Sequence, residues 1–204
     1  MKRVAYFLSY LLHPALAPFI ALGVVLWSDT RFALNLNEEA KRFALGYTMM
    51  LTFVLPLLFL MSMKRIGIVT NYHLGDRRER IIPMGMGVLF YGFNFFFFKG
   101  LQYPSAVRSV ALAMFAVALI IFLVTFFYKA SVHAAGMASL FGGLLAFSKL
   151  YGQDLSLWLT LIVVLAGLVG TARLILKAHS ESELAMGYFI GFLTAFFCVY
   201  LELG

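Results

Sequence analysis

Long apolar stretches separated by short polar segments set the pattern of this chain. Seven stretches contain no Asp, Glu, Lys or Arg, and they cover Val4–Ser28, Phe43–Met63, Ile81–Phe98, Ser109–Tyr128, Ala130–Ser148, Leu155–Ala172 and Leu184–Leu201. About 20 apolar residues suffice for a helix to cross the hydrocarbon core of a bilayer. Backbone groups in lipid must pair within their own segment, and the stretches lack the alternating polar face of a barrel strand. We therefore predict helices.

The stretches predict an all-α fold: a polytopic transmembrane helical bundle with six or seven spans, forming one domain over residues 1–204. The first stretch decides the count. His13–Pro14 and Pro18 interrupt its helical hydrogen bonds, so it can kink and cross, re-enter, or lie along the membrane surface. The next helix should begin after the run Asn35-Leu36-Asn37-Glu38-Glu39, which offers an Asn cap and an acidic first turn.

The composition supports an integral membrane protein. The 204 residues are 63% hydrophobic and 12% charged, whereas soluble domains are about 45–50% apolar and about 25% charged. The net charge of +7 is spread over the segments between the apolar stretches. This distribution favours membrane topology and anionic lipid headgroups as its cause and argues against nucleic acid as a partner.

Three polar segments fall on the same side of the membrane when successive stretches alternate in direction. They are Lys64–Arg80, Lys129–Ser131 and Arg173–Glu183. Charged groups at membrane depth are costly, so their gathering at one side indicates a functional site. The excess of Lys and Arg on this side disappears when the candidate ligand cations are set aside, so the positive-inside rule leaves the side open.

The first two segments each carry a possible anion site. The segment Asp76–Arg80 holds three arginines, whose planar donor forks match phosphate oxygens; its alternative interpretation is a loop that only fixes topology. In the second segment, Lys129 and Ser131 precede His133 at the start of an apolar helix. Free amides there can hold an anion, and the histidine can donate a proton. Otherwise His133 is an interfacial histidine hydrogen-bonded to a neighbouring helix.

The third segment combines Arg173, His179 and Glu183. A continuous helix would place His179 and Glu183 four residues apart on one face. The carboxylate would then hold one ring nitrogen protonated and leave the other for nucleophilic attack. The alternative is a surface ion-pair patch that includes Lys177 and Glu181.

Two further histidines carry less weight as catalytic candidates. His13 precedes a proline in the interrupted first stretch, and His73 lies in a polar loop where contact with solvent or headgroups is the expected role. The spacing of histidines and carboxylates does not form a metal-binding set.

The three segments resemble the motifs of the type 2 phosphatidic-acid phosphatase superfamily of membrane phosphatases. That family has Lys-x6-Arg-Pro, then Pro-Ser-Gly-His, then Ser-Arg-x5-His-x3-Asp. Here Arg173, His179 and Glu183 reproduce the third spacing with Glu in place of Asp, and Ser131-Val132-His133 resembles the second motif. The spacing of the first motif is absent, although Arg77 and Arg80 resemble its cations.

The resemblance implies a role for each of these side chains and no metal or other cofactor. His179 would be the nucleophile that forms a phosphohistidine, Glu183 would orient it, and His133 would protonate the leaving alcohol. The implied phosphate-binding residues are Arg173, Lys129, Ser131, Arg77 and Arg80.

The sequence therefore predicts a membrane lipid-phosphate phosphatase. Its substrate would be phosphatidic acid, phosphatidylglycerol phosphate or an isoprenoid (pyro)phosphate, and its location the bacterial inner (cytoplasmic) membrane. The expected partners are this substrate and the membrane lipids, with the oligomeric state left open. Two alternatives are a catalytically silent relative that binds or transports a phospholipid, and a small channel or carrier whose polar groups line a path.

Overall fold

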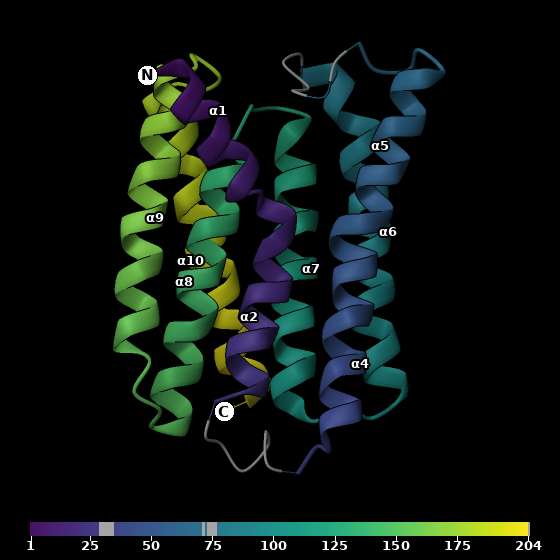
Figure 1. Ribbon diagram of the computed structural model, residues 1–204, viewed down its shortest axis with the longest axis vertical. Coiled ribbons are helices and arrows are strands. Elements are labelled where there is room, and N and C mark those ends of the chain that lie inside the picture. Colours follow the sequence, from purple (N-terminus) through teal and green to yellow (C-terminus); the bar gives the residue numbers. More distant parts are fainter. Residues whose placement is uncertain (29–34, 71, 73–76, 204) are drawn as a thin grey trace.

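The computed structural model describes residues 1–28, 35–70, 72 and 77–203. These residues form an up-and-down bundle of helices with roughly parallel axes (Figure 1). The described part contains no β-strand and has seven helical segments long and apolar enough to cross a membrane. This confirms the all-α polytopic bundle, with seven spans. His73 and Asp76 lie outside the described residues.

Five of the seven spans are single helices, and the first and second are composite. The elements are α1 (Lys2–Leu11), η1 (Pro14–Leu16), α2 (Ala17–Leu26), α4 (Glu38–Met49), η2 (Met50–Val54), α5 (Leu55–Arg65), α6 (Arg77–Gly100), α7 (Ser105–Thr125), α8 (Val132–Tyr151), α9 (Ser156–Ile175) and α10 (Glu181–Leu203). The predicted start of α4 is confirmed, because the Asn37 side chain accepts a hydrogen bond of 2.8 Å from the backbone N–H of Ala40.

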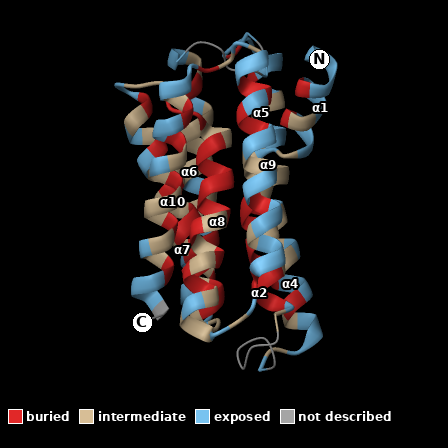
Figure 2. Ribbon diagram, turned by 90° about the vertical axis from the view of Figure 1, so that its left-hand side faces the viewer, coloured by how far each residue is buried: buried red, intermediate tan, exposed pale blue. Residues whose placement is uncertain are grey.

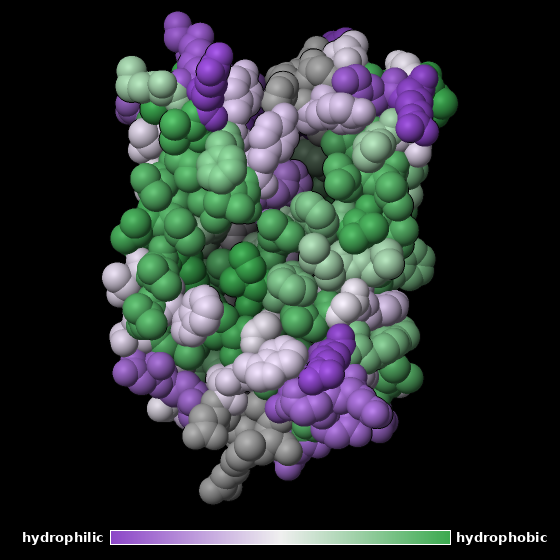
Figure 3. Space-filling model, viewed as in Figure 1, coloured by the Kyte–Doolittle hydropathy of each residue, from purple (hydrophilic) through white to green (hydrophobic). Residues whose placement is uncertain are grey.

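The surface of the bundle suits a lipid environment. On the face shown in Figure 3, apolar residues form a broad band across the middle, and polar residues gather at the two ends. Buried residues face the interior, and among the described residues they are most numerous along α8 (Figure 2). The chain is thus an integral membrane protein that exposes many large apolar side chains on its outer surface.

The first span crosses the membrane but is broken at His13–Pro14. Beyond the break, the freed carbonyl of Ala15 accepts a hydrogen bond of 3.3 Å from the Thr52 hydroxyl, which belongs to the π-helical turn η2. A Cβ on Gly136 of α8 would lie 2.9 Å from the Cβ of Pro14, so only glycine lets the break pack this closely. The break is therefore a fixed interior feature. The predicted interruption of this helix is confirmed, and the composite span is long and apolar enough to cross a membrane.

Glycines also hold the starts of α8 and α10 together. A Cβ on Gly187 would collide with the carbonyl oxygen of Ser131, and a Cβ on Gly191 with that of Ala135. Two small residues four positions apart let helix backbones approach closely in a membrane. The backbone N–H of Ser131 donates to the carbonyl oxygen of Glu183 at 3.0 Å. This close packing fixes the position of the segment that carries Glu183 relative to α8.

We expect Gly191→Ala to destabilise the bundle by about 1–3 kcal/mol, because the added methyl group overpacks the contact between α8 and α10. Gly167→Ala on α9 is the matched control, since a Cβ there meets nothing within 4 Å. The melting temperature of the detergent-solubilised protein measures both effects. Equal melting temperatures for the two variants would contradict the packing argument.

Candidate functional site

The elements that carry the candidate residues converge at one end of the bundle. The helices alternate in direction, so the chain's N-terminus, the starts of α6, α8 and α10, and the end of α9 share one end, which is uppermost in Figure 1. This is the co-localisation that the sequence predicts. Several polar side chains in this region are buried: Ser9, Arg80, Ser131, Arg173 and His179.

His179 and Glu183 form the shortest polar contact of this region. The distance between Nδ1 of His179 and Oε2 of Glu183 is 2.7 Å. The predicted continuous helix is wrong, however. Helix α9 ends at Ile175, and the chain turns through Lys177, which has a φ of 52°, before α10 begins. His179 lies in this turn, so helical periodicity is not what brings the two side chains together.

A capping box makes the contact instead. The Ser180 hydroxyl accepts a hydrogen bond from the backbone N–H of Glu183, and the Glu183 carboxylate accepts one from the backbone N–H of Ser180, each at 3.3 Å. This reciprocal pair is the standard way for a Ser-x-x-Glu sequence to begin a helix. It leaves the carboxylate facing back toward the preceding residue, which is His179. The two side chains therefore meet for a local structural reason.

The surroundings of His179 favour a neutral ring with one available nitrogen. Burial lowers the pKa of His179 below its ordinary value, and the positive charges of Arg80 and Arg173 lower it further. The hydrogen bond to Glu183 and the charge of that carboxylate oppose these effects without overcoming them. Because Nδ1 donates its proton to Glu183, the lone pair of the neutral ring is on Nε2.

Arg173 is a buried cation without a carboxylate partner in the described part of the chain. It is only 8% exposed, and Nη1 lies 3.5 Å from the Ser9 hydroxyl oxygen. Its Nε has no hydrogen-bond partner among the described residues. Burying a charge uncompensated costs several kcal/mol. A guanidinium with free donors in a buried site suits an anionic ligand.

Arg80 adds a second buried cation to the same region. It is 6% exposed and interacts electrostatically with both Arg173 and Glu183. The interpretation of its segment as a loop is wrong for Arg77–Arg80, because these residues form the first turn of α6. Within this turn Arg80 lies deeper than Arg77, which is exposed. Among the described residues, the cluster thus brings together the guanidinium groups of Arg80 and Arg173 and the Glu183 carboxylate.

His133 is held by the broken first span. Its Nε2 lies 3.2 Å from the carbonyl oxygen of Ser9, and because a carbonyl only accepts, this nitrogen carries the proton. The ring centroid of His13 is 5.8 Å from that of His133. Sequence reasoning gave His13 little weight and missed Ser9. The helix break at His13–Pro14 was the one available signal, since a lone serine in an apolar stretch gives none.

The remaining predicted ligands differ in how they relate to this cluster. The hydroxyl oxygen of Ser131 caps α8 by accepting from the backbone N–H of Ala134 at 3.3 Å, and its proton stays available for a ligand. Lys129 is half-buried in the connection before α8. Among the described residues, no hydrogen bond or ion pair joins Lys129 or Arg77 to the cluster.

The described residues contain no group of three or more His, Cys, Asp or Glu side chains placed to hold a metal ion. No protein-family model, no curated protein and no solved structure matches this chain.

Proposed function

We propose that this protein is a membrane lipid-phosphate phosphatase that hydrolyses a phosphomonoester or pyrophosphate of a lipid through a phosphohistidine intermediate. One observation carries the proposal: the buried guanidinium of Arg173, whose Nε has no hydrogen-bond partner among the described residues, belongs to the same cluster as His179, whose ring is held by Glu183. Phosphoryl transfer requires a cation that binds the phosphate and a nucleophile held in place beside it, and Arg173 and His179 are suited to these two roles. The resemblance to the type 2 phosphatidic-acid phosphatases supports the same reaction.

In the first step, Nε2 of His179 attacks phosphorus and the bond from phosphorus to the ester oxygen breaks. The neutral ring of His133, whose Nε2 proton is held by the Ser9 carbonyl, takes up the acidic proton of the bound phosphomonoester at Nδ1 and gives it to the departing alcohol. The phosphorylated His179 ring carries a positive charge, which the Glu183 carboxylate stabilises. Arg173 and Arg80 neutralise the charge that spreads over the phosphoryl oxygens.

In the second step, water attacks phosphorus and the bond from phosphorus to Nε2 of His179 breaks. The neutral ring of His133 accepts the proton of this water at Nδ1 and passes it to the departing orthophosphate, which restores the neutral ring for the next cycle. Orthophosphate leaves. The residue that acts as acid in the first step thus acts as base in the second.

A lipid is the substrate class that suits the architecture. Most of the described chain lies in membrane-spanning helices, which leaves little mass to recognise a large soluble substrate. The cluster lies at one end of the bundle, where a headgroup meets protein while its chains stay in lipid. This also argues against a channel path lined by these groups. We assign the protein to the bacterial inner membrane on the resemblance alone.

Phosphate release from lipid phosphates tests the proposal. Detergent-purified protein is incubated with phosphatidic acid, phosphatidylglycerol phosphate and prenyl phosphates in the presence of a chelator. We expect release from at least one substrate and inhibition by orthovanadate, which mimics five-coordinate phosphorus. A folded protein that releases phosphate from none of them would contradict catalysis, and binding without turnover would support the silent relative.

The pH dependence of turnover gives a second test. Because the pKa of His179 is lowered, its ring stays neutral as the pH falls, so the acid limb of kcat/KM should lie below about pH 6.5, the ordinary value for histidine. Glu183 raises this pKa, so Glu183→Gln should move the acid limb to still lower pH and also reduce kcat. A pH profile of both proteins measures the shift.

Glu181→Gln is the matched control for this prediction, because Glu181 is exposed in the same helical turn. Its profile should coincide with that of the wild type. An acid limb that moves equally in both variants would mean that general surface charge, rather than the contact with His179, sets the profile.

A further inference from the structure

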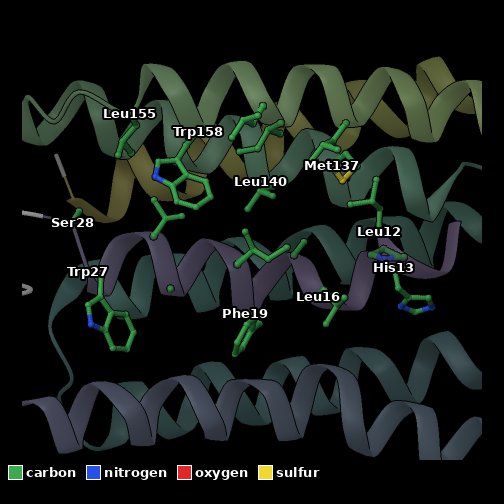
Figure 4. A pocket seen from close by; sticks show the side chains of 18 residues that line it. Leu12, His13, Leu16, Phe19, Trp27, Ser28, Met137, Leu140, Leu155 and Trp158 are labelled. Atoms are coloured by element: carbon green, nitrogen blue, oxygen red, sulfur yellow. The ribbon is translucent and has the colours of Figure 1, made fainter. Parts of the chain in front are cut away.

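An apolar groove begins beside the candidate site and runs along the first span. Its volume is about 550 Å³, and side chains of α2, α8 and α9 form most of its walls (Figure 4). Leu12 and His13 lie at one end, and Trp27, Leu155 and Trp158 lie at the other. Almost all of the lining is apolar.

The groove is long compared with one leaflet of a bilayer. The stretch Pro14–Leu26 runs beside it and, at about 1.5 Å per residue, is roughly 20 Å long. Half of the hydrocarbon core is only about 15 Å thick. Trp27 and Trp158 at the far end are 50% and 45% exposed, as is usual for tryptophans at a membrane interface. The groove therefore extends past the middle of the bilayer.

The near end of the groove lies beside the cationic cluster. His13 lines the groove, and its ring centroid lies 5.8 Å from that of His133. His133 and Arg173 both contact Ser9. A molecule with an anionic head and an apolar tail would thus place the head near Arg173 and the tail in the groove.

The length of the groove is suited to one long chain. The two acyl chains of a glycerophospholipid belong to the same leaflet and end near the middle of the bilayer. A single chain that continues past the middle uses the whole length of the groove.

We propose that this groove binds the tail of a single-chain lipid phosphate that reaches past the middle of the bilayer, which is the chemistry of a long prenyl phosphate. The proposal rests on the proposed phosphatase function and narrows its substrate class. It predicts that prenyl phosphates are hydrolysed in preference to phosphatidic acid.

Blocking the groove tests this proposal. Leu161 of α9 lines the groove and is 45% exposed, so Leu161→Trp fills space with little disturbance of the core. Val163→Trp is the matched control, because Val163 is 54% exposed on the same helix and is not a lining residue. We expect kcat/KM for a long prenyl phosphate to fall about tenfold in Leu161→Trp, the equivalent of losing roughly two methylene contacts. Leu161→Trp should still turn over geranyl phosphate at the wild-type rate, because this short chain does not reach the blocked part of the groove. Val163→Trp should turn over both substrates as the wild type does.

A photoreactive prenyl phosphate separates this proposal from the phosphatase proposal. The groove should be labelled at α2 and α9 in the wild type and equally in His179→Ala, since labelling requires no turnover. Labelling of the groove without phosphate release from any substrate would contradict the proposed phosphatase function but support the proposed binding of the lipid tail. The groove proposal would be overturned if phosphate is released but labelling occurs elsewhere, or if kcat/KM for the long prenyl phosphate falls equally in Leu161→Trp and Val163→Trp. Either result would leave the phosphatase proposal standing.

Discussion

Replacing His179 by alanine should lower kcat for phosphate release by about 10³-fold or more, the scale on which enzymes lose activity when a covalent nucleophile is removed. The variant has no Nε2 to form the bond with phosphorus. The Glu183 carboxylate loses its 2.7 Å contact but keeps its bond to the Ser180 backbone N–H, so the start of α10 should persist. The measurement is single-turnover phosphate release from a prenyl phosphate, with folding checked by melting temperature.

His133→Ala distinguishes the nucleophile from the proton donor. Loss of the donor should slow esters with poor leaving groups and spare p-nitrophenyl phosphate, whose leaving group needs little protonation. His179→Ala should lose activity equally toward esters with poor leaving groups and toward p-nitrophenyl phosphate. Ser182→Ala, an exposed neighbour in the same turn, should behave as wild type. Turnover retained by folded His179→Ala would remove the phosphohistidine from the mechanism.

The sequence predicts most of the fold because the relevant signals are local. The length of an apolar stretch decides whether it spans, and successive spans alternate in direction, so counting alone places Arg80, His133 and His179 at one end. The cap at Asn37 is equally local, because its side chain bonds within the first turn of α4. The His179–Glu183 contact was predicted for the wrong reason, since a capping box rather than a continuous helix supplies it.

The remainder of the site depends on contacts between distant segments. Ser9 lies 124 positions from His133 and 164 from Arg173, and it contacts both. Nothing near Ser9 in the sequence indicates this pairing. It arises because Gly136 admits the break at Pro14 against α8, which is a matter of shape between two helices. For the same reason the location of His13 beside His133 could not be predicted from an isolated His-Pro pair.

Replacing Arg173 by methionine should separate stability from activity. The guanidinium is buried with no carboxylate partner in the described chain, so an apolar side chain of similar length removes a desolvated charge and should keep or raise the melting temperature. Turnover should fall by about 10²–10³-fold, as when a preorganised donor to a transition state is lost. Phosphate or orthovanadate at about 100 times its Kd should stabilise the wild type by about 2.7 kcal/mol and leave the variant unchanged.

Arg108→Met is the matched control for this experiment. Arg108 also lies in a helix and also has an Nε without a partner among the described residues, but it pairs with Glu202 at 3.5 Å near the opposite end of the bundle. Its replacement should leave turnover and the stabilisation by vanadate unchanged. Equal stabilisation of Arg173→Met and the wild type would show that the anion binds without Arg173. The buried charge would then need another explanation, because a cation with no anion to bind only costs the fold free energy.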